Sequence, residues 1–313
     1  MHEKQINSDN IIIPEAPSGF KSGFVGIIGR PNVGKSTLMN KMVGEKIAIT
    51  SPVAQTTRNR LRGILTTAEA QIIFVDTPGI HKPHHELGKL LVKNAKNAIE
   101  AVDVVVLVVD SSVEAGGGDR FIIDILSKTQ TPIIFGLNKS DLQGEKKEKI
   151  DESYREINIK SWEMIKFSAS TGEGIDSLLK LLKEKLTPGP YYYPPDLVTD
   201  QPERFIMGEL IREQILLMTR QEIPHSVAVV IEKVEETAKI TNIFAAINVE
   251  RDSQKGIIIG KGGSMLKQIG IVARQQIQKL IAGEVYLELF VKVEPKWRQS
   301  RLRLAELGYR LEE

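Results

Sequence analysis

One stretch of the sequence combines residue types and spacing that suit phosphate chemistry. It follows the apolar run 24–28 with the pattern G-x-x-x-x-G-K-S, and its members are Gly29, Arg30, Pro31, Asn32, Val33, Gly34, Lys35 and Ser36. Glycines let the backbone turn tightly, so that successive N–H groups can point at a β-phosphate. The lysine would neutralise the β and γ phosphates, and the serine hydroxyl would hold Mg²⁺. The pattern predicts a phosphate-binding loop that opens a helix near Thr37; the alternative is a glycine-rich turn without a ligand.

A second polar stretch follows the predicted strand 71–75, and its members are Asp76, Thr77, Pro78 and Gly79. An aspartate at the carboxyl end of a strand can hold the hydration shell of Mg²⁺, and a glycine N–H can reach a γ-phosphate unobstructed. Between the two stretches, Thr56 and Thr57 lie in a polar loop, where a hydroxyl could reach the metal only when the γ-phosphate is present. Surface threonines in a turn are the alternative. The predicted metal ligands are Ser36, Thr57 and Asp76.

A third stretch has the chemistry to choose a purine. It follows the apolar run 132–137, and its members are Asn138, Lys139, Ser140 and Asp141. Guanine carries N1–H and an amino group at N2, and the single carboxylate of Asp141 can accept both hydrogens. Against adenine this acceptor would stay unpaired, which costs binding free energy. We expect Lys139 to lie along the base and Asn138 to tie this stretch to the phosphate-binding loop.

These stretches need a scaffold that brings the ends of several strands together. Apolar runs alternate with helical stretches up to residue 187, and a run at 164–167 leads into Ser168 and Ala169, where a backbone N–H could meet guanine O6. The apolar run 104–109 is typical of a central parallel strand covered on both faces. We therefore predict an α/β fold for residues 21–187, a doubly wound sheet with its ligand at the carboxyl ends of the strands.

In this order, the four stretches resemble the motifs of the translation-factor-like small GTPases. The resemblance implies GTP and GDP as ligands, Mg²⁺ as the metal, and hydrolysis of GTP to GDP and phosphate. It makes Asn32, Lys35, Thr57 and Gly79 the candidate catalytic residues. The residues expected to bind the nucleotide are Gly29, Arg30, Pro31, Asn32, Val33, Gly34, Lys35, Ser36, Thr37, Asp76, Thr77, Pro78, Gly79, Ile80, Asn138, Lys139, Asp141, Ser168 and Ala169.

The sequence departs from the Ras-like pattern at Ile80, where those GTPases carry the glutamine that orients the attacking water. An apolar side chain cannot do this. Intrinsic hydrolysis should therefore be slow, on the order of 10⁻² per second or less, and depend on a group supplied from elsewhere. Asn32 stands where a related subgroup of GTPases uses an asparagine to hold K⁺ beside the phosphates. The resemblance thus implies K⁺ as the missing positive charge.

A proline-rich linker, residues 188–203, follows the first domain, because prolines cannot continue a helix or a central strand. Its tyrosines at 191–193 are expected to pack between the domains, with stacking on nucleic acid as the alternative. Residues 204–313 then show a helix, two strands, a G-x-x-G loop within helical sequence and a final strand. This order resembles a type II KH domain, the bacterial type, and implies a smaller α+β fold.

In KH domains the G-x-x-G loop clamps the backbone of single-stranded RNA, because glycine lets the sugar-phosphate approach the main chain. A plain turn at a helix start is the alternative. Local charge favours RNA, since residues 255–303 contain ten Lys or Arg against three Glu, whereas the whole chain carries a net charge of +2. The expected RNA-binding residues are Ile259, Gly260, Lys261, Gly262, Gly263, Lys267, Lys296 and Arg298.

Composition sets further bounds on the 313-residue chain. It contains no cysteine, which excludes disulfides and thiolate metal sites and suits a reducing cytosol. No apolar run approaches the roughly 18 residues of a membrane-spanning helix. Residues 1–20 resemble a flexible polar tail. We expect a cytoplasmic monomer.

A GTPase domain joined to a bacterial-type KH domain resembles the Era-like GTPases, over roughly residues 20–310. The resemblance implies binding to 16S ribosomal RNA near its 3′ end and assistance in maturation of the 30S subunit. Two alternatives stay open. One is an RNA chaperone whose nucleotide site only stabilises the fold. The other is a GTPase that uses the basic segment from Lys296 for peripheral contact with the inner face of the plasma membrane.

Overall fold

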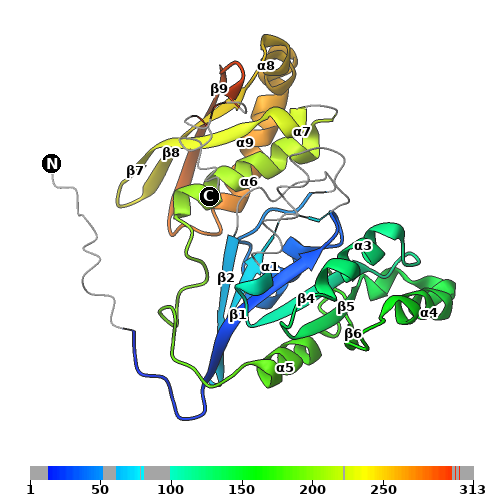
Figure 1. The fold of residues 1–313 in the computed structure, drawn as a ribbon. Coiled ribbons are helices and arrows are strands. Elements are labelled where there is room, and N and C mark those ends of the chain that lie inside the picture. Colours follow the sequence, from blue (N-terminus) through cyan, green and yellow to red (C-terminus); the bar gives the residue numbers. More distant parts are fainter. Residues whose placement is uncertain are drawn as a thin grey trace. The chain divides into compact units, whose positions relative to one another are not determined.

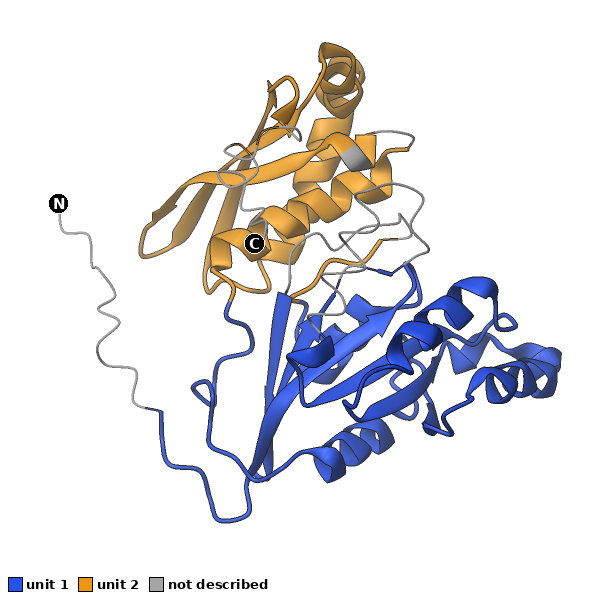
Figure 2. Cartoon of the chain, in the orientation of Figure 1, with its two compact units in different colours: residues 1–46, 60–200 blue, residues 47–59, 201–313 orange. Residues whose placement is uncertain are grey.

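A computed structural model describes residues 13–51, 61–77, 79–80, 99–220, 223–297, 300 and 303. The chain divides into two compact units, residues 1–46 with 60–200 and residues 47–59 with 201–313 (Figure 2). The chain passes between the units at 46/47, 59/60 and 200/201, and the last of these positions lies inside the predicted linker. The predicted site residues Thr57, Pro78 and Arg298 lie outside the described residues, as does most of the predicted tail.

Within its described residues, the first unit is built on a six-stranded sheet with strand order β2-β3-β1-β4-β5-β6 (Figure 1). The strands are β1 (Lys21–Gly29), β2 (Leu61–Thr66), β3 (Ala70–Asp76), β4 (Val104–Asp110), β5 (Ile133–Asn138) and β6 (Glu163–Lys166). Only β2 pairs antiparallel, with β3, because the short turn 67–69 cannot make the crossover that parallel neighbours need. The predicted α/β doubly wound sheet is confirmed, with this one antiparallel edge.

The core of this unit is formed by apolar strands and by the apolar faces of amphipathic helices. Its helices include α1 (Lys35–Val43), α3 (Gly117–Leu126), α4 (Lys147–Ile157) and α5 (Ile175–Lys185), with 3-10 turns η2 (Ser140–Leu142) and η3 (Gly144–Lys146). In β4 every residue from 104 to 109 is at most 1% exposed, as a parallel strand covered on both faces requires. Helix α4 was not singled out in the sequence, although its few buried apolar residues, Ile150, Tyr154 and Ile157, stand at the i, i+4, i+7 spacing of a helix.

The linker is fastened to the first unit. The Tyr191 ring lies 4.4 Å from Phe20 and the Tyr192 ring 5.2 Å from Phe24, measured between ring centroids. The Gln71 side chain accepts hydrogen bonds from the N–H groups of Tyr192 and Tyr193, at 2.8 and 3.0 Å. These contacts lie within the first unit, whereas the sequence led us to expect packing between the domains.

The second unit has a three-stranded sheet in its described residues, with order β7-β8-β9. Its elements are α6 (Glu203–Met218), α7 (Ile223–Ser226), β7 (Ala228–Glu236), β8 (Ile240–Val249), α8 (Asp252–Ile259), η4 (Lys261–Gly263), α9 (Ser264–Ile277) and β9 (Glu284–Val293). β7 and β8 form a hairpin, while β8 and β9 are parallel and joined through α8 and α9. Helices α6 and α9 pack together, and α9 also packs on β9. This is the predicted α+β arrangement.

The basic segment that starts at Lys296 contains a core residue. Trp297 is 2% exposed, and its indole Nε1–H donates a hydrogen bond to the carbonyl of Ser226 at 3.2 Å. Among the described residues, no helix is long and apolar enough to span a lipid bilayer.

Candidate functional site

The predicted phosphate-binding loop joins the end of β1 to the start of α1. Its backbone turns through the left-handed region at Asn32, with φ 64°, and at Gly34, with φ 95°. A Cβ at Gly34 would lie 2.4 Å from Nδ2 of Asn138, an atom that donates a hydrogen bond to the carbonyl of Val33 at 2.8 Å. Only glycine leaves room for this contact, which explains the second glycine of the pattern.

Lys35 is buried at the start of α1, where its Nζ donates to the carbonyl of Arg30 at 3.0 Å. Burial lowers the pKa of Lys35, and the nearby carboxylate of Asp76 offsets part of that shift. A buried ammonium is most stable as a cation when an anion lies beside it. Phosphate oxygens in the loop would supply that negative charge.

The structure brings together two of the three predicted metal ligands. The Ser36 hydroxyl donates to Oδ2 of Asp76 at 2.9 Å, which joins the start of α1 to the end of β3. Thr77 is held next to it by a hydrogen bond from its hydroxyl to the carbonyl of Ile27, at 3.0 Å. A hydroxyl and a carboxylate are oxygen donors of the kind Mg²⁺ prefers, so the residues present fit that metal.

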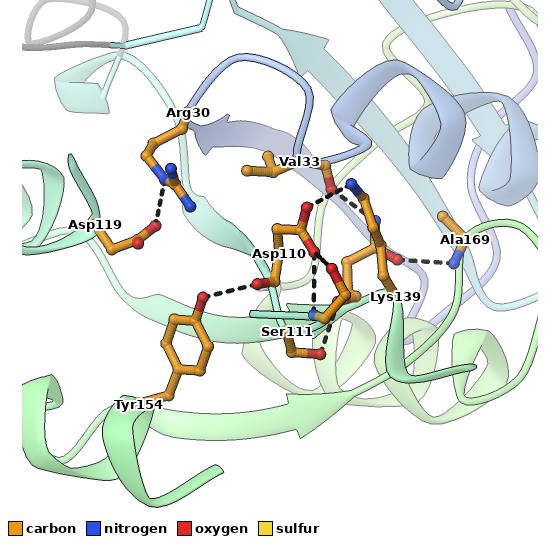
Figure 3. A network of polar contacts seen from close by, with 10 residues as sticks. Arg30, Val33, Asp110, Ser111, Asp119, Lys139, Tyr154 and Ala169 are labelled. Atoms are coloured by element: carbon orange, nitrogen blue, oxygen red, sulfur yellow. Dashed lines mark hydrogen bonds and ion pairs between the residues drawn. The ribbon is translucent and has the colours of Figure 1, made fainter. Parts of the chain in front are cut away.

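Arg30 is one of the predicted nucleotide-binding residues, but its side chain is directed elsewhere. Its Nε pairs with Oδ1 of Asp119 at 2.7 Å, at the start of α3 (Figure 3). A Cβ at Gly118 would lie 2.6 Å from Cδ of Arg30, so the arginine packs closely over that glycine. The Arg30 side chain therefore anchors the loop to α3, and only its main chain is placed to serve a ligand.

The residues after β3 lie close to the phosphate-binding loop. A Cβ at Gly79 would lie 2.7 Å from the backbone N of Pro31, and the Ile80 N–H donates to the carbonyl of Gly29 at 3.1 Å. The Ile80 side chain is 4% exposed and belongs to the hydrophobic core with Ile28. Its burial agrees with the expectation that it cannot orient a water molecule.

Asn138 connects the loops on which the predicted guanine contacts lie. Besides its bond to Val33, its Oδ1 accepts the N–H of Ala169 at 2.9 Å. Ala169 is 4% exposed and Ser168 is 1% exposed. The Ala169 N–H, a candidate donor to guanine O6, is thus already used to fix the two loops together (Figure 3).

Asp110 at the end of β4 supports the same loops and was not singled out in the sequence. It forms an ion pair with Nζ of Lys139, whose backbone φ is 64° (Figure 3). Burial alone would raise the pKa of Asp110, but hydrogen bonds from Lys139 and Ser112 outweigh it and lower that pKa. An aspartate at a strand's carboxyl end, as at Asp76, was the available signal.

The second unit contains an open groove of about 480 Å³ between α9 and β9. Leu266, Ile271 and Leu289 give it apolar walls. Its polar lining comes from Lys267, Arg274, Tyr286 and Glu288, of which the sequence analysis identified only the first. The alternation along β9 was the signal for Tyr286 and Glu288.

The G-x-x-G loop borders this groove. Gly262 and Gly263 have φ of 60° and 79°, and a Cβ at either would meet nothing within 4 Å, so a ligand can approach the backbone there. Gly260, with φ 71°, packs against Met265 instead. The side chains of Lys261 and Lys267 are exposed on the same loop and on α9. Ile259 ends α8 next to the loop, while Lys296 follows β9.

This fold and these two sites define a P-loop GTPase followed by a KH domain. A family described as "50S ribosome-binding GTPase" matches residues 24–139, and the KH domain family matches residues 222–298. GTPase Era of Rippkaea orientalis is 73% identical over 99% of both chains, and GTPase Era of Nostoc sp. is 71% identical over 98% of this chain and 95% of the other. The chain belongs to the GTPase Era family.

Two solved structures resemble the whole chain. One is Era in complex with MgGDPNP and nucleotides 1506–1542 of 16S ribosomal RNA, and the other is a variant of Aquifex aeolicus Era bound to GDP and AlF₄⁻. Each is 38% identical to this chain, with a TM-score of 0.86, and covers 93% of this chain and 100% of its own.

Gly34→Ala should weaken GDP binding by at least about tenfold, because the new methyl group displaces Asn138 in addition to straining a left-handed residue. Gly44→Ala is the matched control, since Gly44 has φ 85° but open space around it. Titration of a fluorescent GDP analogue measures both affinities. Equal losses in the two variants would show that backbone strain, not the Asn138 contact, decides binding.

Proposed function

We propose that this protein is a GTP-hydrolysing switch that binds 16S ribosomal RNA near its 3′ end and assists maturation of the 30S subunit. The observation that carries the proposal is that Asn138 joins the phosphate-binding loop to the loops predicted to contact guanine, and that the same chain has an exposed basic groove beside a G-x-x-G loop. The likeness to an Era structure that contains 16S ribosomal RNA supports the choice of RNA.

In this proposal, different residues of the first unit bind the phosphates, the metal and the base of the nucleotide. Lys35 neutralises the phosphates, and Gly79 offers its N–H to the γ-phosphate. Ser36 and Asp76, with Thr57, hold Mg²⁺, which when bound neutralises charge that develops on the phosphate oxygens. Asp141, exposed on η2, accepts the N1 and N2 hydrogens of guanine.

Slow intrinsic hydrolysis of GTP suits a switch that has to stay in its GTP-bound state until it binds RNA. With Ile80 buried in the core, no side chain at that position orients water, so the rate depends on added positive charge. We propose that Asn32 binds a K⁺ ion beside the phosphates. Asn32 is exposed on the phosphate-binding loop, and its backbone φ is 64°.

Exchange of K⁺ for Na⁺ should lower the rate of GTP hydrolysis by at least about tenfold, because the smaller Na⁺ fits a K⁺ site poorly and the positive charge beside the phosphates is then lost. Asn32→Gly should remove this difference without straining a left-handed residue. Phosphate release measured in the two salts tests both statements. A wild-type rate that is the same in K⁺ and Na⁺ would refute the assignment.

The groove of the second unit suits single-stranded RNA. Its apolar walls and Tyr286 can stack on bases, and the exposed backbone at Gly262 and Gly263 can meet the sugar-phosphate. Lys261 and Lys267 supply positive charge at the same place. The nucleotide state of the first unit would then control access to this groove.

RNA binding is tested with an oligonucleotide of the 3′ end of 16S ribosomal RNA, by anisotropy with a GTP analogue or GDP present. The double variant Lys261→Asp, Lys267→Asp should lose at least about tenfold in affinity, and its salt dependence should be shallower by about 1.4, or 0.7 for each lost phosphate contact. GTP hydrolysis without RNA should not change.

The matched control is Lys160→Asp, Lys180→Asp, which changes net charge equally at exposed positions of the first unit. It should bind RNA like the wild type. If both double variants lose RNA affinity equally, RNA is attracted by overall positive charge and the groove is not its specific binding site. Equal RNA affinity with GTP analogue and with GDP would contradict the switch.

The proposal includes a cytoplasmic monomer acting on the 30S subunit. Peripheral contact with the plasma membrane stays a prediction. Of the basic segment that suggested it, the structure describes Lys296, Trp297, Ser300 and Arg303, and Trp297 is buried.

A further inference from the structure

A partly buried polar cluster lies behind the two loops that carry the predicted guanine contacts, and no step of the proposed mechanism uses it. We call Gln143, Asp151 and Lys166 the Gln143 cluster. The Gln143 amide donates from Nε2 to Oδ1 of Asp151 at 2.9 Å, and its Oε1 accepts from Nζ of Lys166 at 3.0 Å. Lys166 also forms an ion pair with Oδ2 of Asp151. Each member therefore contacts the other two.

The three members come from different elements, two of which carry candidate base contacts. Gln143 directly follows η2, the turn that presents Asp141. Lys166 is the last residue of β6 and stands two positions before Ser168. Asp151 lies on α4, so the cluster ties both loops to one helix. Elsewhere the loops are joined by the hydrogen bond from the Ala169 N–H to Oδ1 of Asn138 at 2.9 Å, and by backbone hydrogen bonds of 3.0 Å (Phe167 N–H to Leu137 carbonyl) and 3.3 Å (Ser140 N–H to Phe167 carbonyl). The cluster adds side-chain contacts to these.

The position of the Asp141 carboxylate depends on this support. Among the described residues, no hydrogen bond or ion pair holds that carboxylate, and the residue is exposed. The backbone of η2 therefore places Asp141, and this single turn has one end at Lys139 and the other at Gln143. Gln143 is 5% exposed, so it fixes the second end against the protein interior.

The two charges of the cluster, the Asp151 carboxylate and the Lys166 ammonium, compensate each other. Burial alone would raise the pKa of Asp151, but hydrogen bonds from Lys166 and Gln143 outweigh it, and that pKa lies below its ordinary value. Asp151 is therefore ionised at neutral pH and pairs with the lysine cation. Removal of one charged partner leaves the other partly buried without compensation, so the loops would move to resolve it.

We propose that Gln143, Asp151 and Lys166 are positioning residues for guanine selection, which hold the 138–141 loop and the 168–170 loop at the spacing that a guanine base requires. The proposal rests on the proposed function, because it assumes a guanine nucleotide at this site. None of the three residues touches the nucleotide; they act through Asp141 and the backbone after β6.

The test compares the affinities of the full-length protein for GDP and for inosine diphosphate, whose base lacks the N2 amino group. In the wild type the ratio should be at least about tenfold, the value of one hydrogen bond to a charged group. Lys166→Met should weaken GDP binding and bring the ratio close to one, because a displaced Asp141 no longer accepts the N2 hydrogen. Lys166→Arg should restore much of the ratio.

Lys128→Met is the control, since Lys128 forms an exposed ion pair with Asp124 on α3. If Lys166→Met fails to fold, Gln143→Met serves in its place, because it keeps the Asp151 and Lys166 pair and removes only the link to η2. A variant that loses thermal stability but keeps the wild-type ratio would overturn the inference. Failure of the wild type to prefer GDP over ADP would instead overturn the proposed function.

Discussion

The amide of one buried side chain, Asn138, holds the candidate nucleotide site together. It donates to the Val33 carbonyl at 2.8 Å and accepts from the Ala169 N–H at 2.9 Å, so that three loops share one anchor. Gly34 must lack a side chain for this contact to exist. Because the same residue fixes the phosphate-binding loop and the loops predicted to face the base, phosphate binding and base selection are mechanically linked. A site of this design suits a whole guanine nucleotide.

The two candidate sites use positive charge differently. In the first unit, Arg30 and Lys166 are held by partners, Asp119 and Asp151, that the proposed mechanism does not use. Fixed pairs of this kind preorganise loops at the ends of parallel strands. In the second unit, by contrast, Lys261 and Lys267 are exposed, and no ion pair among the described residues involves either. Exposed lysines suit a flexible polyanion. This contrast between a rigid nucleotide site and an open groove is what a member of the GTPase Era family would need to couple GTP to RNA.

The sequence was informative where chemistry depends on local spacing. The pattern around Gly34 and Lys35 predicted both the turn and the helix that follows, because backbone conformation there is set by neighbouring residues. It was uninformative where contacts are non-local. Nothing in the sequence near Arg30 indicates that its guanidinium pairs with Asp119, and nothing near Lys166 points to Asp151. Helix α4, which carries Asp151, escaped prediction because it has few apolar residues.

We propose that a single carboxylate, that of Asp141, selects guanine over adenine. The most direct test of this proposal is the Kd of the Asp141→Asn variant for GTP and for xanthosine triphosphate, measured with Mg²⁺ present. The amide can donate to the O2 of xanthine, where guanine has an amino group. GTP affinity should fall by at least about a hundredfold, because two charge-assisted hydrogen bonds are lost, and xanthosine triphosphate should become the preferred ligand. A variant that still prefers GTP would show that the Asp141 carboxylate does not select the base.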